Sequence, residues 1–125
     1  MKVYLAGPMR YYKGYNFQAF IDEAARLRAA GHEVVSPAEM DMEKYPHINW
    51  LELDGEDHPD IPDFSIEDTL FNDFRQIVYN VDGIALLPGW SKSSGATAEF
   101  FVANCFRREV LYCEGAEEFK ELVAA

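Results

Sequence analysis

Short apolar runs alternate with amphipathic stretches along most of the chain. The runs predict buried strands over residues 3–6, 33–36, 83–87 and 109–113. The stretches with apolar residues at helical spacing predict helices over residues 17–30, 64–80, 95–107 and 116–124. Continuously apolar strands separated by helices are typical of a parallel sheet covered on both faces. The pattern predicts an α/β fold, a small Rossmann-like or flavodoxin-like three-layer domain with a parallel sheet of four or five strands.

One acidic segment departs from this alternation. The 125 residues are enough for one domain. Between Ala38 and Asp68 the chain carries 11 acidic residues and one basic residue, whereas the rest of the chain is nearly neutral. A connection this long is usually functional or mobile, so it indicates a lid or a partner-binding surface, although a solvated insertion explains it equally well. We expect a single domain over residues 1–125 with an acidic insertion at about 38–68.

Charge and hydropathy exclude several classes of protein. A net charge of −11 leaves no basic face for a nucleic acid, so we expect no nucleic-acid partner. No apolar run approaches the roughly 20 residues that span a bilayer, and Met1 leads directly into a strand-like run, so we expect a cytoplasmic protein without a membrane partner. Cys105 and Cys113 lie in apolar segments and are interpreted as reduced core thiols. The three histidines lack ligand spacing, so we expect no metal site and no cofactor.

Two loops follow the first and third predicted strands, at the edge where open parallel sheets bind ligands. The first runs from Gly7 to Asn16 and the second from Pro88 to Gly95. Each precedes a helix whose free N–H groups favour an anion, and together they hold the cations Arg10, Lys13 and Lys92. A phosphate or carboxylate of a small ligand fits there, although glycine and serine also serve simply as turn formers. The loop residues Tyr11, Tyr12, Tyr15 and Trp90 would suit stacking on a base or packing beneath the acidic segment.

Two carboxylates and a tyrosine are the candidate reactive groups. Glu99 lies in the first turn of the predicted helix after the second loop, where the positive helix end keeps a carboxylate ionised, as a nucleophile requires. A glutamate at this position is also explained without any reactive role, because acidic residues in the first turn stabilise a helix through its dipole. Asp73 falls in the apolar register of its helix, so we expect partial burial and a raised pKa. Such a pair is of the kind that breaks glycosidic bonds. Tyr4, in the first strand, could reach the same site.

Three segments carry a resemblance to a known family. They are Val3-Tyr4-Leu5-Ala6-Gly7-Pro8-Met9-Arg10, the stretch Leu27 to Pro37 with Gly31-His32-Glu33-Val34-Val35-Ser36, and Asp82 to Glu99 with Leu87-Pro88-Gly89-Trp90-Ser91-Lys92-Ser93-Ser94-Gly95-Ala96. In order and spacing they resemble the nucleoside 2-deoxyribosyltransferase superfamily, in particular its small phage and bacterial branch, which includes nucleoside 5′-monophosphate N-glycosidases. The likeness covers nearly the whole chain except the acidic segment.

The resemblance implies an enzyme that binds a nucleoside or its 5′-monophosphate and cleaves the N-glycosidic bond. It implies that Glu99 attacks the anomeric carbon, that Asp73 protonates the base or holds a sugar hydroxyl, and that Tyr4 orients the nucleophile. The sugar then passes to another base or to water. The implied substrate-binding residues are Gly7, Met9, Arg10, Gly89, Trp90, Ser93 and Gly95. A serine at position 93, in place of the acid of nucleoside transferases, favours a 5′-phosphate, and family members are homodimers or larger assemblies.

Three other interpretations stay open at this point. Phosphoribohydrolases with a Pro-Gly-Gly-x-Gly-Thr-x-x-Glu loop share similar chemistry, but here Pro88-Gly89 and Gly95-Ala96-Thr97-Ala98-Glu99 are six residues apart. A non-catalytic nucleotide-binding or sensing module would keep the glycine loops without needing the two carboxylates. An acidic decoy protein would mimic nucleic acid through residues 39–68.

Overall fold

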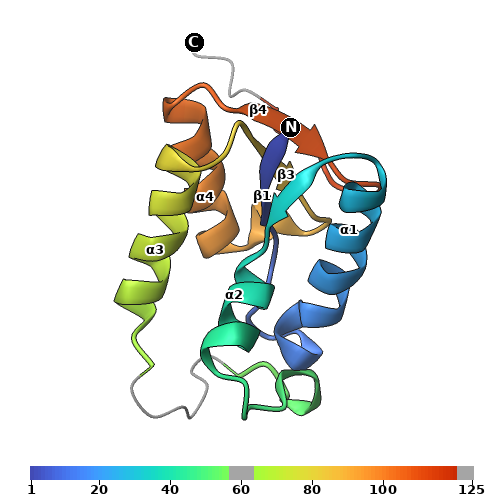
Figure 1. Cartoon of the computed structure of the whole chain (residues 1–125), viewed down its shortest axis with the longest axis vertical. Coiled ribbons are helices and arrows are strands. Elements are labelled where there is room, and N and C mark those ends of the chain that lie inside the picture. Colours follow the sequence, from blue (N-terminus) through green and yellow to red (C-terminus); the bar gives the residue numbers. More distant parts are fainter. Residues whose placement is uncertain (57–63, 121–125) are drawn as a thin grey trace.

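The computed structural model describes residues 1–56 and 64–120 as a parallel sheet with helices on both faces (Figure 1). The strands are β1 (Lys2–Ala6), β2 (Glu33–Val35), β3 (Gly83–Leu86) and β4 (Glu109–Tyr112). The α-helices are α1 (Phe17–Ala29), α2 (Pro37–Lys44), α3 (Ile66–Tyr79) and α4 (Ser94–Cys105). Three short 3₁₀ helices are η1 (Lys13–Asn16), η2 (Trp50–Glu52) and η3 (Trp90–Lys92).

The strand order is β2-β1-β3-β4, and each neighbouring pair is parallel. In the central strand, Val3 lies opposite Val34 on one side and Gly83 on the other. The chain therefore winds outward in both directions from the β1–β3 pair, which places the reversal of strand order between these two strands. The predicted α/β fold with a small Rossmann-like parallel sheet is confirmed, with four strands.

Alternation along β1 builds two cores, one on each face of the sheet. Val3 and Leu5 belong to the core beneath α1, whereas Tyr4 and Ala6 belong to the core beneath α3 and α4. Figure 1 shows α1 on one side of the sheet and α3 beside α4 on the other. Phe20 and Ile77 are fully buried on the two faces, and each such side chain stabilises the fold by about 1.5–3 kcal/mol.

Local signals set the ends of the main helices within one or two residues of the predicted positions. The helix α1 stops before Gly31, whose φ of +100° suits glycine. The helices α3 and α4 each begin after a serine whose hydroxyl accepts a hydrogen bond from a first-turn N–H, Ser65 from Asp68 and Ser93 from Ala96.

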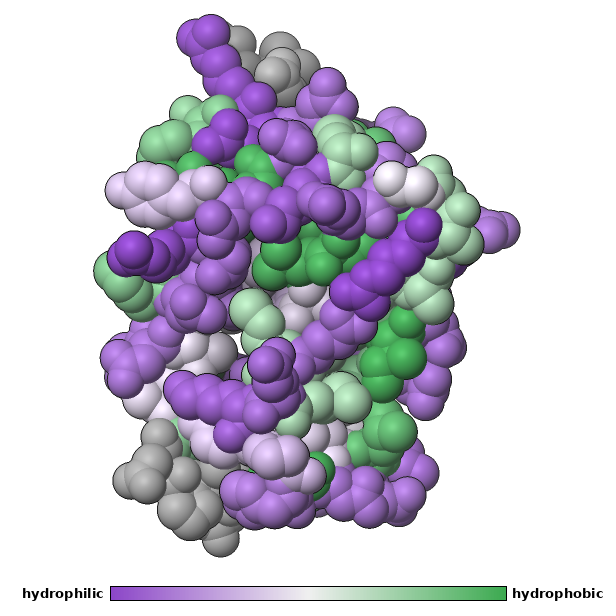
Figure 2. Space-filling view, in the orientation of Figure 1, coloured by the Kyte–Doolittle hydropathy of each residue, from purple (hydrophilic) through white to green (hydrophobic). Residues whose placement is uncertain are grey.

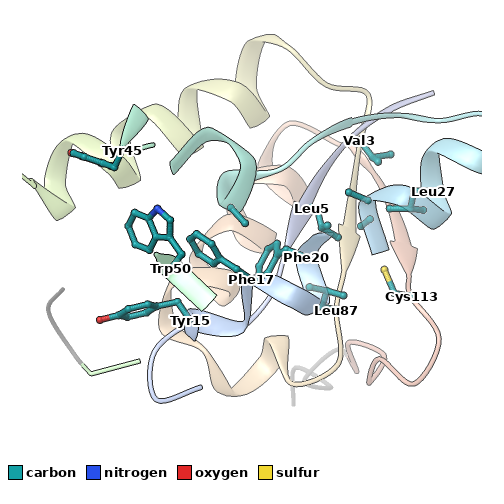
Figure 3. Close-up of a cluster of buried hydrophobic side chains, with 13 residues drawn as sticks. Val3, Leu5, Tyr15, Phe17, Phe20, Leu27, Tyr45, Trp50, Leu87 and Cys113 are labelled. Atoms are coloured by element: carbon teal, nitrogen blue, oxygen red, sulfur yellow. The ribbon is translucent and has the colours of Figure 1, made fainter. Parts of the chain in front are cut away.

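The acidic segment differs most from expectation, because much of it is folded onto the core. Its first residues form α2, which begins with Pro37 and is tied to α1 by an ion pair of 2.6 Å between Arg28 and Glu39. Trp50 is 5% exposed and stacks on Phe17 with ring centroids 4.9 Å apart (Figure 3). Residues 57–63 of the predicted segment lie outside the described residues.

Backbone hydrogen bonds also tie the acidic segment to the loop after β1. The N–H of Tyr11 donates to the carbonyl oxygen of Gly55, and that of Gly14 donates to Leu53, both at 2.6 Å. Gly55 has a φ of +84°, and a Cβ atom there would lie 1.9 Å from the carbonyl oxygen of Tyr12. The acidic segment and the loop after β1 therefore approach each other too closely for any side chain at position 55.

Two further predictions are corrected. Residues 116–120 of the expected closing helix are not helical, and its last four residues, 121–124, lie outside the described part of the chain. Cys105 is exposed at the end of α4 and is no core thiol, whereas Cys113 is buried, which raises its pKa to about 12. Within residues 1–56 and 64–120, no helix is long and apolar enough to cross a membrane.

We predict that Trp50→Ala lowers the free energy of unfolding by about 3–5 kcal/mol, because it empties a site enclosed by aromatic rings. Urea denaturation followed by circular dichroism measures the change. The neighbouring Leu51→Ala, at an exposed position, is the matched control and should cost less than about 1 kcal/mol. Equal effects of the two substitutions would contradict the assignment of this segment to the core.

Candidate active site

A cavity of about 590 Å³ opens at the carboxyl ends of β1 and β3, where the strand order reverses. This position is the usual ligand site of open parallel sheets, and the volume falls in the range of roughly 300–1,000 Å³ that small-molecule sites occupy. The loops after β1 and β3, the first turns of α3 and α4, and part of α2 form its walls. In Figure 1 these elements lie in the lower half of the view.

The cavity floor brings the three predicted reactive residues together. Tyr4 is fully buried in β1, and its hydroxyl donates a hydrogen bond to Oε2 of Glu99. Glu99 comes from the first half of α4, and Asp73 from the middle of α3; each is 6% exposed, and both line the cavity. Residues 95 positions apart thus meet because β1 is central and α4 packs on it.

Burial dominates the electrostatics of the two carboxyl groups. Burial, together with the negative charge of Asp41, raises the pKa of Asp73 to about 7, although a hydrogen bond with Tyr4 opposes the rise. The expected burial and raised pKa of Asp73 are confirmed. Burial also raises the pKa of Glu99, with Asp73 adding to the shift and Tyr4 opposing it. Burial thus opposes the ionised Glu99 that was expected from its place near the helix start, and the hydrogen bond from Tyr4 favours it.

The pair consequently retains a proton near neutral pH. The pKa of the Tyr4 hydroxyl is raised well above 10 by burial and by the two carboxyl groups, so Tyr4 remains a hydrogen-bond donor. Its single hydrogen points at Glu99, which stabilises the carboxylate form of that residue. The arrangement favours an ionised Glu99 beside a protonated Asp73, one nucleophile and one acid.

Most of the predicted binding residues lie on the cavity wall. Those that line it are Gly7, Met9 and Arg10 from the loop after β1, and Gly89, Ser93 and Gly95 from the loop after β3. At Gly7 a Cβ atom would lie 2.7 Å from Cβ of Leu87, so only glycine lets the two loops approach this closely. Lys92 also lines the cavity, and Lys13 does not.

Trp90 lies apart from the cavity wall. It is 2% exposed, packs against Phe100 with ring centroids 4.8 Å apart, and donates its indole N–H to the carbonyl oxygen of Glu117 at 2.7 Å. The carboxylate of Glu117 also accepts hydrogen bonds from the N–H of Gly89 and the hydroxyl of Ser91. Trp90 therefore anchors the loop after β3 beneath the segment 114–120.

The sequence analysis missed an aromatic and acidic wall contributed by the acidic segment. Trp50, Phe64 and Asp41 line the cavity together with Tyr12 and Tyr15 from the loop after β1. A signal was present, because β2 is parallel to β1 and its carboxyl end also leads to this edge, where α2 begins.

Hydrophilic side chains cover most of the face seen in Figure 2, and apolar residues are confined to small patches on it.

Among the described residues, no group of three or more His, Cys, Asp or Glu side chains could hold a metal ion. The titratable side chains that line the cavity include the carboxyl groups of Asp73 and Glu99 and the cations Arg10 and Lys92.

We predict that Asp73→Asn makes folding stability less dependent on pH. A carboxyl group with a raised pKa in the folded state stabilises it below pH 4, and this contribution is lost as pH rises through about 7. At pH 8 the variant should therefore be more stable than wild type by about 4 kcal/mol, with little difference at pH 4. Urea midpoints across this range test it, with Asp22→Asn on the exposed face of α1 as the control. Parallel pH profiles of wild type and Asp73→Asn would contradict it.

Comparison with known proteins adds a family but no function. No curated protein and no solved structure matches the chain. One family model matches residues 1–112, from β1 to the last residue of β4, and so spans the sheet, the helices and every residue of the candidate site. The chain therefore belongs to the family described as a domain of unknown function, DUF4406.

Proposed function

We propose that this protein cleaves the N-glycosidic bond of a nucleoside or, preferentially, of its 5′-monophosphate, and passes the sugar through Glu99 to water or to another base. The observation that carries the proposal is the buried contact of Tyr4, Glu99 and Asp73 on the floor of a cavity with aromatic walls. No cofactor takes part, because two carboxyl groups in different protonation states are sufficient for this chemistry.

In the first step, the ionised carboxylate of Glu99 attacks the anomeric carbon and forms an ester. The carbon–nitrogen bond breaks, its electron pair stays with the base, and the proton of Asp73 neutralises the leaving nitrogen. Tyr4 donates to one oxygen of Glu99, which leaves the other oxygen for attack. A low-dielectric floor strengthens both effects, since all three groups are almost completely removed from water.

In the second step, water or a second base attacks the same carbon and Glu99 leaves as a carboxylate. The ionised Asp73 accepts the proton of the attacking group, which restores the starting state of the pair. The balance between hydrolysis and transfer depends on whether a second base can displace water from the aromatic wall.

Several features support a 5′-phosphate on the substrate. Arg10 and Lys92 both line the cavity, and Lys92 lies two residues before the first turn of α4, where a helix start favours an anion. The oxygen of Ser93 accepts a hydrogen bond from the N–H of Ala96, so its hydroxyl hydrogen remains available to a phosphate oxygen. An acid at this position would repel the phosphate.

We predict that purified protein releases free base from 5′-monophosphates faster than from nucleosides, and that Glu99→Ala and Glu99→Gln abolish release. The rate should fall at least about 1,000-fold, because no carboxylate remains to attack the anomeric carbon. Chromatography of each incubation, with and without an added second base, measures hydrolysis and transfer separately. Mass spectrometry of the denatured protein should show a sugar adduct on wild type only.

The control for this screen is Glu118→Gln, at an exposed position outside the cavity wall. Base release that persists in both Glu99 variants would exclude Glu99 as the nucleophile. A nucleotide that binds to wild type and stays intact after long incubation would instead identify a binding or sensing module. Release from nucleosides alone would contradict the interpretation of Ser93.

We also propose that the chain forms a homodimer through α3 and α4. Phe71 and Tyr79, two turns apart on α3, are 68% and 75% exposed, and Phe101 and Phe106 near the end of α4 are about half exposed. The two helices pack side by side, so these aromatic rings lie on neighbouring helices. Large exposed aromatic side chains on adjacent elements are typical of an interface.

We predict that sedimentation equilibrium gives twice the chain mass of 14.3 kDa. The double substitution Phe71→Glu and Tyr79→Glu should give a monomer with an unchanged circular dichroism spectrum, because both side chains are exposed. A wild-type protein of single-chain mass at 100 μM would contradict the proposal.

A further inference from the structure

Asp41 is a charged residue in the cavity wall, and it has no role in the proposed mechanism. It lies on α2 and lines the main cavity together with Asp73. It also lines, again with Asp73, a second hollow of about 460 Å³ between α2 and α3. Among the described residues, none donates a hydrogen bond to its carboxylate; Lys44 acts on it only through its charge.

The position of Asp73 indicates which part of a substrate meets Asp41. In the proposed reaction, Asp73 protonates the leaving base, so the base has to lie against Asp73. Asp41 is near enough to act on Asp73 by its charge, and it approaches from the α2 side of the cavity. A base held there would have its ring faces against Phe64 and the loop tyrosines, and its edge toward Asp41 and the indole N–H of Trp50.

A second polar group in the same wall lacks a partner. The indole nitrogen of Trp50 is buried and has no hydrogen-bond partner within the described residues, although Trp50 itself is 5% exposed and lines the cavity. Figure 3 shows the edge that carries this nitrogen turned away from the ring of Tyr15. A buried donor without a partner is destabilising, and a ligand oxygen in contact with it would remove the cost.

We propose that Asp41, assisted by Trp50, selects guanine as the base of the substrate. The inference rests on the proposed function. A carboxylate accepts two adjacent donors, and the N1–H and 2-amino group of guanine are such a pair, while the O6 atom of guanine can accept from the indole N–H. Adenine and cytosine present a ring nitrogen acceptor beside their amino group, and uracil and thymine place carbonyl oxygens on both sides of one N–H. A carboxylate repels these acceptors.

The test compares guanosine and inosine 5′-monophosphates, which differ only in the 2-amino group. Wild type should show a kcat/KM about 10- to 100-fold higher for the guanine nucleotide, because the hypoxanthine base makes one charge-assisted hydrogen bond fewer. Asp41→Asn keeps the size of the side chain and loses the second acceptor oxygen, so the ratio should fall to about 1–3. Trp50→Phe should lower both values and leave the ratio unchanged, because both bases carry O6.

Glu43→Gln is the matched control, since Glu43 lies on the same helix and lines only the second hollow. It should keep the wild-type ratio. Thermal unfolding verifies that each variant is folded. Asp41→Asn should be at least as stable as wild type, because it removes a half-buried charge whose pKa burial raises to about 6.

Calorimetric binding of the same two nucleotides to Glu99→Ala separates this inference from the proposed function. Glu99-dependent release of other bases in preference to guanine would overturn the role of Asp41 and leave the proposed function standing. Guanine-selective binding that Asp41→Asn removes, with no base released by wild type, would support the base site and overturn the proposed function. An equal response to both nucleotides in binding and in rate would overturn the inference.

Discussion

The hydrogen bond from Tyr4 to Glu99 is the interaction on which the site depends. It joins the middle of the central strand to the first half of α4, and it lies beneath the cavity rather than in it. The helix can lie this close to the sheet because its inner positions include Ala96 and Ala103, both almost fully buried. The same contact that positions Glu99, the proposed nucleophile, therefore also joins a helix to the sheet.

This arrangement is costly, and the cost indicates a function. Burial raises the pKa values of Asp73, Glu99 and Asp41, and among residues 1–56 and 64–120 no cation forms an ion pair with Asp73 or Glu99. Buried carboxyl groups without a cationic partner destabilise a folded protein at neutral pH. A fold that needed only a core would place apolar residues there, as it does at Ile77 on the next turn of α3. Such conflicts between stability and local chemistry are typical of reactive sites.

The sheet and three helices could be predicted because the strands are continuous apolar runs and the helices have apolar residues at regular helical spacing. Glycine or proline marks the end of several of these elements. The helix α2 was not predicted, because four of its eight residues are charged and they hide any apolar spacing. The burial of Trp50 was not predicted either, because a single aromatic residue in an acidic segment gives no repeating apolar pattern. The prediction of a closing helix over residues 116–124 was wrong for residues 116–120. Tertiary contacts decide that segment, because the Glu117 carboxylate binds the loop after β3 and Phe119 packs on Phe100. Sequence spacing identified the reactive carboxyl groups, but only the packing of α2 brings Asp41 to them.

For the proposed nucleotide substrate, the distribution of charge around the cavity favours one orientation. Lys92 lies just before the start of α4, Arg10 lies in the loop after β1, the carboxyl groups of Asp73 and Glu99 lie on the floor, and Asp41 lies on α2. A phosphate is repelled by the floor and by α2, so it has to stay near the cations. The base then extends toward the aromatic wall, and the sugar between them comes to rest over Glu99. In the proposed reaction the acidic segment, which its charge alone suggested was an external surface, would therefore act from inside, because Asp41 would exclude the phosphate from one end of the cavity.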